Sequence, residues 1–265
     1  MSHFNIRASR NRTGDPNLEE FKMHTHDTYE LYCFLDGDAD YFVEGTVYSL
    51  KRGDILLLKK AEAHSLMIRT ACPYERMTVH FSDAAILSQQ REQLCNFLDS
   101  RPLGQHNRYS ASIFKNTNWL YYLDKICQTA NVAQRRLYLT VILCELMENA
   151  SKVIHGDTAQ KDSITEVISY INDHLTEKLS LEHICEAFYM SKAQLNRRFK
   201  KTTGSTVWEY ITTKRLALAN GYLQDGESPS IVCGKSGFND YCSFYRAYKQ
   251  KYGISPKAGQ NRTVK

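Results

Sequence analysis

Apolar and polar residues alternate in short runs along the first third of the chain, a pattern typical of β-strands. The runs between residues 23 and 81 read YELYCFL, ADYFVEG, DILLLKK, HSLMIRT and ERMTVHFS, and Gly, Asp and Pro separate them. Their succession predicts an antiparallel β-sandwich or barrel. After about residue 84 the apolar residues recur at helical spacing instead, most clearly in RRLYLTVILCELMENASKV at residues 135–153.

A polar stretch, HGDTAQKD, separates this part of the chain from a second helical part. We therefore place an interdomain linker at residues 155–162. An N-terminal domain at 1–154 precedes the linker, and a second domain at 163–265 follows it. The expected fold class is α+β, with an antiparallel β-barrel and its following helices before an all-α domain.

The second domain contains an internal repeat at an offset of 49 residues. The segments LNRRFKKTTG at 195–204 and FYRAYKQKYG at 244–253 align without gaps, and both carry Arg, an aromatic residue, Lys and a closing Gly at the same positions. Ser191 and Asp240 precede them at equal distances, where helix N-caps are needed, and Gln194 completes a capping box in the first. Because each closing Gly suits a helix C-terminus, we expect two equivalent helices.

A short helix and a tight turn precede each of these capped helices, which is the arrangement of a helix-turn-helix unit. Ser180 is the expected cap of the first short helix. In the second unit Ser228 is the cap, and Pro229 stands at the first helical position, where its missing N–H costs nothing. Between the units, residues 207–224 predict a linker helix that holds them at a fixed separation.

The charge distribution places the repeat in a nucleic-acid-binding domain. The chain has 34 Lys+Arg against 29 Asp+Glu, a net charge of +5. From residue 190 onward the count is 14 against 4, a balance of +10, whereas residues 1–160 hold 18 against 19. A basic C-terminal third on a neutral body is the electrostatic pattern of a domain that binds nucleic acid.

Several protein classes are excluded by the same composition. No apolar run approaches the roughly 18 to 20 residues of a membrane span, and the start lacks the apolar stretch of a signal peptide. We therefore expect a cytoplasmic protein with no membrane partner. The eight cysteines are scattered without a CxxC pair, so they are interpreted as small core residues. Since no phosphate loop, dinucleotide fingerprint or nucleophile pattern appears, we expect no enzyme activity and no cofactor.

The two capped helices predict similar outer faces, because Leu195 and Phe199, and likewise Phe244 and Tyr248, are four apart and should point inward. Arg can bond guanine O6 and N7 together, Asn can pair with adenine, and Lys near a helix end suits phosphate. The expected DNA-binding residues are Ser191, Lys192, Ala193, Asn196, Arg197, Lys200 and Lys201 in the first helix and Tyr241, Cys242, Tyr245, Arg246 and Lys249 in the second. The alternative is that these charged residues only form the solvent-exposed faces of surface helices. Because the same face is repeated in two capped helices of a basic region, DNA binding is the favoured interpretation.

The run LSLEHICEAFYMSKAQLNRRFKKTTGSTVWEYI, followed by GFNDYCSFYRAYKQKYGISP, resembles the DNA-binding domain of the AraC-type (AraC/XylS-like) transcription factors. The resemblance covers about residues 163–257 and is most characteristic at 237–256. It implies a sequence-specific regulator of transcription, activator or repressor, which binds double-stranded DNA and has RNA polymerase as a further candidate partner. It places the base-reading positions at Ala193, Asn196 and Arg197, and at Tyr241, Cys242, Tyr245 and Arg246.

One departure from the family pattern occurs in the supporting helix of the second unit, PSIVCGKS. It is a residue short, has Cys233 where a small Ala is usual, and includes Gly234. We therefore expect this unit to pack less well and to contribute less to specificity.

A histidine-rich motif marks the N-terminal domain. The segment from His24 to Gly37 has the spacing HxHx₃Ex₆G, and residues 53–64 are similar to a second half. Both resemble the two motifs of cupin β-barrels, as found in the sensor domains of many AraC-type proteins, which implies a cupin-like barrel. Period-two alternation puts the motif's histidines on one strand face with Glu30, Tyr32 and Phe34. The residues expected to bind a small-molecule effector, with a sugar as one candidate, are His24, His26, Glu30, Tyr32 and His64.

The same residues leave an alternative open. His24, His26, Glu30 and His64 can ligate a divalent metal, which would make the barrel a metal-dependent cupin enzyme or a metal sensor fused to a DNA-binding domain. The second half departs from the metal-cupin pattern, because Lys59, Ala61 and Ile68 occupy its Pro, Gly and Asn positions. An organic effector is therefore preferred, although the barrel's aromatic residues suit an ordinary core as well as a sugar ring.

A homodimer formed through the N-terminal domain is expected from the apolar helix at 135–153. Its residues Leu139, Leu143, Leu146 and Met147 can form a stripe wide enough for a partner helix. The alternative is that this helix only covers the barrel.

Overall fold

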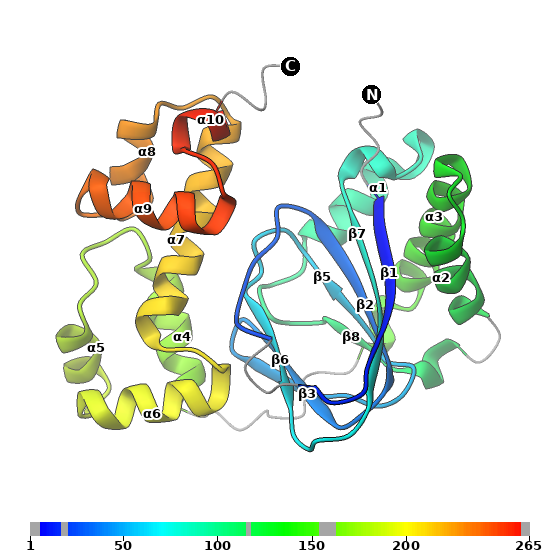
Figure 1. Ribbon diagram of the computed structural model, residues 1–265, viewed down its shortest axis with the longest axis horizontal. Coiled ribbons are helices and arrows are strands. Elements are labelled where there is room, and N and C mark those ends of the chain that lie inside the picture. The colour runs from blue at the N-terminus through cyan, green and yellow to red at the C-terminus, as the bar shows by residue number, and fades with distance from the viewer. Residues whose placement is uncertain (1–5, 17–20, 115–117, 154–162, 261–265) are drawn as a thin grey trace. The chain divides into compact units, whose positions relative to one another are not determined.

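The computed structural model describes residues 6–16, 21–114, 118–153 and 163–260 (Figure 1). The chain divides into two compact units. The first is drawn from Met1–Phe21 and His26–Ala159, and the second from Lys22–Thr25 and Gln160–Lys265. The linker expected at 155–162 lies outside the described residues.

Two antiparallel sheets form the first unit, one in the order β1-β7-β2-β5-β8 and one in the order β4-β3-β6. The strands are β1 (Ile6–Thr13), β2 (Tyr29–Asp36), β3 (Ala39–Val43), β4 (Thr46–Ser49), β5 (Ile55–Leu58), β6 (His64–Ile68), β7 (Tyr74–Phe81) and β8 (Arg108–Tyr109). The five predicted runs correspond to β2, β3, β5, β6 and β7, so those predictions are confirmed. The strands β1, β4 and β8 were not predicted, since β1 and β4 each bury only one residue and β8 has only two residues.

Alternation along β2 divides the apolar residues between two cores. Tyr32 and Phe34 join a core to which both sheets contribute, whereas Leu31 and Cys33 face a second core on the other side of the larger sheet. Aromatic residues of β3, β4 and β7 fill the first core: Tyr41, Tyr48 and Tyr74. The barrel interior is therefore packed around tyrosines.

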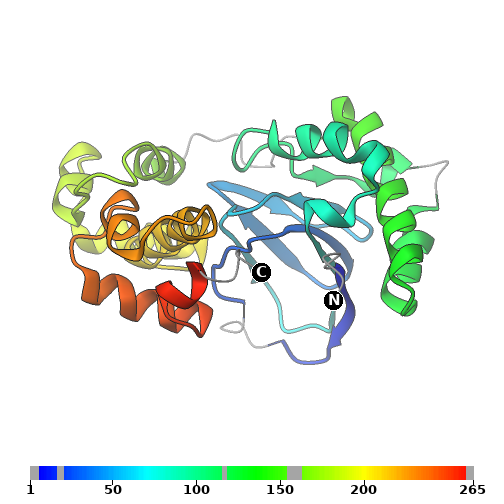
Figure 2. The same cartoon turned by 90° about the horizontal axis from the view of Figure 1, so that it is seen from above.

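Three helices cover the outer face of the larger sheet, α1 (Ser88–Asp99), α2 (Trp119–Gln128) and α3 (Val132–Glu148) (Figure 1, Figure 2). The short 3-10 turns are η1 (Asp83–Ala85), η2 (Ala111–Phe114) and η3 (Ala150–Lys152). Helix α3 begins after the Asn131 cap, whose side chain accepts the backbone N–H groups of Ala133 and Gln134. It corresponds to the long apolar helix expected at 135–153, displaced by a few residues at each end.

The expectation that the apolar stripe of α3 contacts a partner helix is wrong, because that stripe faces the sheet. Leu139, Leu143 and Leu146 are completely buried in the core beneath the helices, and Met147 packs against them. These side chains are therefore not available to a second chain. The most exposed apolar side chains of α3 are those of Leu137 (52% exposed), Val141 and Val132.

The second unit is helical: α4 (Ser163–Asp173), α5 (Leu181–Ala187), α6 (Lys192–Thr203), α7 (Val207–Gln224), α8 (Pro229–Lys235), α9 (Tyr241–Tyr252) and α10 (Pro256–Gln260). Helices α5 and α6 form the first helix-turn-helix unit, and α8 and α9 form the second. The N-terminal part of α7 buries Val207 and Tyr210. Its C-terminal part packs Leu216 and Leu223 into the core of the second helix-turn-helix unit, formed with α8 and α9. The helix expected at 207–224 is confirmed, and it packs against both helix-turn-helix units.

The short helix α8 packs despite its departure from the family pattern. Cys233 is buried in the same core as Val232 and Phe244. A Cβ atom on Gly234 would meet nothing within 4 Å, so this glycine is not required by close packing. Within the described residues, no helix combines the length and the apolarity that crossing a membrane demands.

Candidate functional site

The two helices of the repeat, α6 and α9, are called the recognition helices below. Both begin and end at the predicted residues, but the capping box expected from Gln194 is wrong, because α6 shows only the half in which Ser191 accepts a hydrogen bond. The Ser191 and Asp240 side chains accept the backbone N–H groups three residues on, and Gly204 and Gly253 end the helices in the left-handed conformation with φ of 77° and 72°. The complete capping box lies one helix later, where Thr206 and Glu209 exchange hydrogen bonds at the start of α7. These caps fix where each recognition helix starts and therefore which side chains its first turns present.

Each recognition helix buries one apolar face. Leu195 and Phe199 of α6, and Phe244 and Tyr248 of α9, are completely buried. Tyr248 also donates its hydroxyl to Asn220 Oδ1 on α7, at 2.6 Å. Buried pairs four residues apart leave the opposite face of each helix to solvent.

The expected DNA-binding residues lie on that opposite face or at its caps. Ten of them are exposed: Ser191, Lys192, Ala193, Arg197, Lys200, Lys201, Tyr241, Cys242, Arg246 and Lys249. Asn196 and Tyr245 are half-buried, and the Asn196 amide donates to the Lys192 carbonyl at 3.2 Å. Lys192 forms an ion pair with Glu182 of the supporting helix α5. The structure therefore brings the predicted residues together on two exposed helical faces of the same design.

In the first unit the predicted effector residues gather around one buried carboxylate. Glu30 lies on β2, is 3% exposed, and stands opposite His80 of β7 in the strand register. Its Oε2 atom lies 3.3 Å from His26 Nε2 and 3.4 Å from His64 Nε2, and its Oε1 atom lies 4.0 Å from His80 Nε2. Three imidazoles thus converge on Glu30 from the segment before β2 and from the strands β6 and β7.

The charge state of this cluster follows from its surroundings. Burial raises the pKa of Glu30, but the interactions with His26 and His64 and the charge of His64 and His80 outweigh it, so the pKa lies well below its usual range. Burial lowers the pKa of His80, and the nearby Glu30 carboxylate offsets this only in part. The carboxylate is therefore ionised and the His80 imidazole tends towards its neutral form at pH 7.

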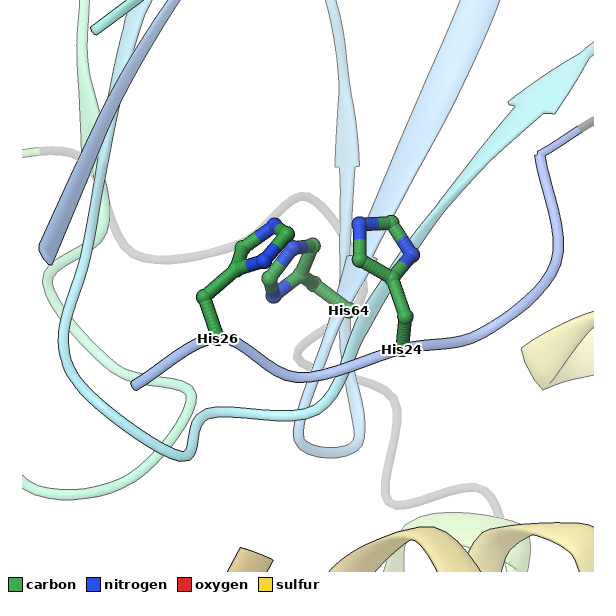
Figure 3. Close-up of side chains that lie close together, drawn as sticks. All are labelled: His24, His26 and His64. Atoms are coloured by element: carbon green, nitrogen blue, oxygen red, sulfur yellow. The ribbon is translucent and has the colours of Figure 1, made fainter. Parts of the chain in front are cut away.

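The protonated nitrogen of His64 is set by a backbone contact. Its Nδ1 atom lies 2.8 Å from the Glu62 carbonyl oxygen. Because a carbonyl oxygen only accepts hydrogen bonds, Nδ1 carries a proton and donates. The other ring nitrogen, Nε2, faces Glu30 and lies 3.4 Å from its Oε2 atom. Figure 3 shows the imidazoles of His26 and His64, together with that of His24.

The structure does not place every predicted effector residue on the strand face expected for it. His24 belongs to the segment Lys22–Thr25, which groups with the second unit, and its Nδ1 atom lies 2.8 Å from the Lys22 carbonyl. The expectation that His24 and His26 share a strand face with Glu30 is wrong, because β2 begins only at Tyr29. Tyr32 does share the face of Glu30, and there its hydroxyl bonds that of Tyr74.

A tyrosine connects the cluster to the barrel core. The Tyr41 ring is stacked with the His64 imidazole at a centroid distance of 6.0 Å and contacts Tyr32 at 4.6 Å. Burial raises the pKa of Tyr41 well above its usual range, so its hydroxyl is neutral. Aromatic side chains therefore occupy the barrel beside the cluster.

His80 is the functional candidate that the sequence pattern missed. It stands outside both histidine motifs and reaches Glu30 only because β2 and β7 pair in the register Glu30↔His80. A signal was available, since alternation in YERMTVHF makes His80 the polar neighbour of two buried residues, Val79 and Phe81.

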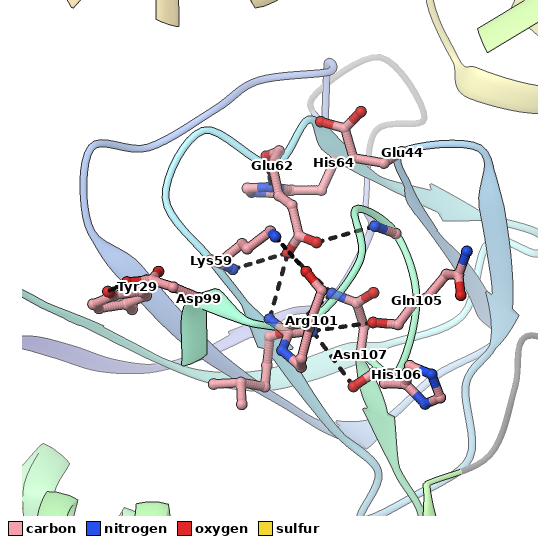
Figure 4. Close-up of polar contacts among 12 residues, drawn as sticks. Tyr29, Glu44, Lys59, Glu62, His64, Asp99, Arg101, Gln105, His106 and Asn107 are labelled. Atoms are coloured by element: carbon pink, nitrogen blue, oxygen red, sulfur yellow. Dashed lines mark hydrogen bonds and ion pairs between the residues drawn. The ribbon is translucent and has the colours of Figure 1, made fainter. Parts of the chain in front are cut away.

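A second buried carboxylate fixes the loop from which β6 starts (Figure 4). Glu62 is completely buried and accepts hydrogen bonds from the Lys59 backbone N–H (2.8 Å), the Gly104 backbone N–H (3.1 Å) and the Asn107 amide (3.0 Å). The Arg101 guanidinium lies 3.7 Å from the same carboxylate. Since the Glu62 carbonyl accepts from His64, this network also holds that imidazole in place.

A hollow of about 660 Å³ on the other face of the larger sheet is lined by charges of both signs, among them Arg10, Glu75 and Asp124. Arg10 bonds Glu75 at 2.8 Å and Asp124 at 3.1 Å. One arginine faces two carboxylates, so this group leaves the hollow with a net charge of −1.

Two family models match the chain. The AraC-like ligand binding domain matches residues 12–115, and a helix-turn-helix domain matches residues 184–262. The first match contains the Glu30 cluster, and the second contains both recognition helices.

Individual relatives match nearly the whole chain. The transcriptional activator RhaS of Escherichia fergusonii is 23% identical over 255 residues, which are 92% of this chain and 89% of the relative. RhaS of Mannheimia succiniciproducens is 24% identical and covers 90% of this chain and 89% of its own. Among solved structures, ToxT from Vibrio cholerae is 14% identical with a TM-score of 0.44, and the match covers 96% of this chain and 97% of that one.

Proposed function

This chain belongs to the AraC-type transcription regulators with a cupin-like sensor domain, and from that premise we propose which residues carry its DNA and effector binding. The second unit binds DNA through α6 and α9. The observation that carries this proposal is the repeated exposed face of two capped helices in a region of charge +10. The contacting residues proposed are Ser191, Lys192, Ala193, Asn196, Arg197, Lys200, Lys201, Tyr241, Cys242, Tyr245, Arg246 and Lys249.

The first unit responds to a small-molecule effector, and we propose the Glu30 cluster as the place where that effector binds. His26, Glu30 and His64 combine a buried carboxylate with imidazoles that can donate or accept hydrogen bonds. Tyr32, on the same face of β2 as Glu30, completes the proposed set. The RhaS relatives are named as transcriptional activators rather than enzymes, which supports a regulatory role for the barrel.

Partners and location are proposed from the same premise. A regulator of transcription acts on chromosomal DNA in the cytoplasm and contacts RNA polymerase. Tyr189 (96% exposed) and Trp208 (51% exposed) are large apolar side chains of the second unit that suit a protein contact. A homodimer through α3 is proposed as well, with Leu137 and Val141 in the interface instead of the buried stripe.

The test of DNA binding is selection of sites from random duplexes by the full chain, followed by affinity measurement on the selected site. Substituting Arg197 and Arg246 together by Ala should abolish preference for the selected site. A matched control removes two exposed arginines of the first unit, Arg12 and Arg52, and should leave the preference unchanged. Equal losses in both double variants would mean that only overall charge matters, and the assignment of the helices would fail.

A further inference from the structure

We propose that the hollow on the outer face of the larger sheet binds an α-amino acid with an apolar side chain. Residues of β1, β2 and β7 and the first turn of α2 line this hollow. Its volume of about 660 Å³ lies within the usual range of small-molecule pockets, roughly 300 to 1,000 Å³. The Glu30 cluster lies on the opposite face of the same sheet, so occupancy of the hollow does not depend on the effector site proposed there.

The charged side chains of the hollow include two that are available to a ligand. Two arginines and three carboxylates give the lining a net charge of −1: Arg10, Arg52, Asp36, Glu75 and Asp124. Arg10 is already shared between Glu75 and Asp124. Asp36 and Arg52 form no ion pair within the described residues. One carboxylate and one guanidinium therefore remain for a ligand that carries both charges.

A β-bulge brings Asp36 to the hollow. The register of β2 with β7 shifts between Phe34 and Asp36, so Leu35 is an additional residue in β2. In regular alternation Leu35 and Asp36 would point to opposite faces of the sheet, yet both line the hollow. Bulges of this kind re-aim side chains beside functional sites.

The position of Asp36 favours a cationic group on the ligand. In the strand register Asp36 stands opposite Glu75, and both residues line the hollow. Like charges directly opposite one another on neighbouring strands repel. The Asp36 Oδ1 atom accepts the backbone N–H of Gly37 at 3.0 Å, which supplies no positive charge. We therefore assign this side of the hollow to the ammonium group of the ligand.

Arg52 provides the opposite charge beside the start of α2. It precedes Gly53, where a Cβ atom would lie only 3.6 Å from Trp119 Cζ2, so this turn packs close to the first residue of α2. An arginine can bond a carboxylate through two parallel N–H groups. The positive end of the α2 dipole, at Trp119 and Leu120, adds to the attraction. This side of the hollow therefore suits the carboxylate of the ligand.

An apolar surface completes the lining. Leu35, Met77 and Trp119 are buried, whereas Leu120 and Tyr121 are 40% and 48% exposed. A ligand side chain that covers these apolar groups removes them from water, which favours binding. An α-amino acid carries an ammonium group, a carboxylate and a side chain on one carbon atom. It thus matches the three kinds of surface that the hollow offers.

The test is isothermal titration calorimetry of the full chain with L-phenylalanine and two analogues that each lack one charge. Phenethylamine lacks the carboxylate, and phenylpropionate lacks the ammonium group. We expect one equivalent of L-phenylalanine to bind with a dissociation constant between about 10 μM and 1 mM. Each analogue should bind at least about 10-fold more weakly, because it leaves one charged side of the hollow without its partner.

Substitutions locate the binding site. Asp36→Asn and Arg52→Gln should each weaken the binding of L-phenylalanine by about 10-fold or more. Both side chains are exposed, so these substitutions should leave the fold intact. The matched control is Asp173→Asn, which removes an exposed carboxylate of α4 in the second unit and should leave the binding curve unchanged.

Three outcomes would overturn the proposal: no binding of L-phenylalanine at about 10 mM, an analogue that binds as tightly, or binding that survives both substitutions. Binding that is lost in Glu30→Gln but kept in Asp36→Asn and Arg52→Gln would place the amino acid in the barrel and would also overturn it. None of these measurements involves DNA. Failure of the hollow as an amino-acid site therefore leaves the assignment of the recognition helices unaffected.

Discussion

Arg215 and Gly237 meet at a point that joins the two helix-turn-helix units. A Cβ atom on Gly237 would lie 2.8 Å from Arg215 Nε and 2.7 Å from the Leu175 carbonyl oxygen. The buried Arg215 donates to the carbonyls of Leu175 and Glu177 at 2.9 and 2.8 Å. The turn between α8 and α9 is thus packed against the loop that precedes α5. Arg215, on α7, connects this turn to that loop.

We expect Gly237→Ala to destabilise the second unit, because Gly237 has φ of +86° and no room for a side chain. The free energy of unfolding should fall by about 1 to 3 kcal/mol. The matched control is Gly234→Ala in α8, where a Cβ atom meets nothing within 4 Å and the unfolding free energy should rise by up to about 1 kcal/mol. Urea unfolding of the full chain measures both, and equal effects would contradict the role given to Gly237.

Local features of the fold could be predicted from the sequence, whereas contacts between distant segments, such as those around Gly237, could not. The helix ends at Gly204 and Gly253 were predictable because capping is local, and the five predicted strands were recognisable because each has a strongly apolar face. Strand β1, with the sequence IRASRNRT, lacks that signal because it is an edge strand with few apolar residues. His80 reaches Glu30 only through long-range strand pairing. A motif read along the chain cannot reveal such a neighbour.

The apolar stripe of α3 shows the same limit in another form. The spacing of Leu139, Leu143 and Leu146 established that one face of the helix is apolar. It did not establish whether that face meets the sheet or a second chain, because burial depends on the tertiary fold. The sheet supplies the partner, and the three leucines are completely buried.

Arg197 and Lys200 should have different effects on DNA recognition although both are exposed on α6. If α6 enters the major groove, Arg197 near its N-terminal half reaches base edges, and Lys200 one turn later contacts phosphate. Arg197→Ala should cost about 1 to 3 kcal/mol on the selected site and flatten preference at one or two base positions. Lys200→Ala should weaken target and random DNA alike and lower the salt slope by roughly one unit.

Arg246 occupies the equivalent place on α9 and provides an internal comparison. Arg246→Ala should flatten preference at bases about one helical turn away from those read by Arg197, roughly 34 Å along the duplex. Binding to a panel of singly substituted sites measures these preferences. An Arg197→Ala variant that lowers every affinity equally would show that α6 contacts phosphate only.

The capping box at the start of α7 should make stability depend on pH. Hydrogen bonds from the Thr206 backbone and side chain, opposed by slight burial, hold the pKa of Glu209 below its usual value. An acid with a lowered folded-state pKa stabilises the fold above its unfolded pKa of about 4.3, and this contribution is lost as the pH falls through the folded value.

Glu209→Ala should therefore cost about 0.5 to 2 kcal/mol at pH 7, and the difference from the unmodified chain should shrink in acid. Glu186→Ala on the exposed face of α5 is the control and should show no such pH dependence. Thermal unfolding at several pH values measures the difference. A Glu209→Ala cost that is constant between pH 7 and pH 3 would contradict the role of the ionised carboxylate.

Glu62 should matter for folding of the sensor unit through its three hydrogen bonds to Lys59, Gly104 and Asn107. Glu62→Leu leaves these donors and Arg101 without their acceptor in a buried site, so unfolding should become easier by about 3 to 5 kcal/mol. Glu92→Leu, on the exposed side of α1, removes the same charge and should change stability by less than about 0.5 kcal/mol. Differential scanning calorimetry resolves both, and comparable effects would show that the network contributes nothing specific.

The proposed dimer can be tested on α3, where Leu137 and Val141 lie one turn apart and are 52% and 40% exposed. Leu137→Glu introduces a charge that a hydrophobic interface would have to desolvate, so the dimer should weaken by 10-fold or more, about 1.4 kcal/mol. Leu143→Glu is not informative, because this side chain is completely buried and the substitution would unfold the unit. Leu103→Glu is the control, since Leu103 is 43% exposed and lies outside α3. Sedimentation equilibrium of the full chain measures the dissociation constant of the dimer. Dimers of unchanged strength in Leu137→Glu would place the interface elsewhere, and monomers in the unmodified chain at tens of micromolar would remove the dimer altogether.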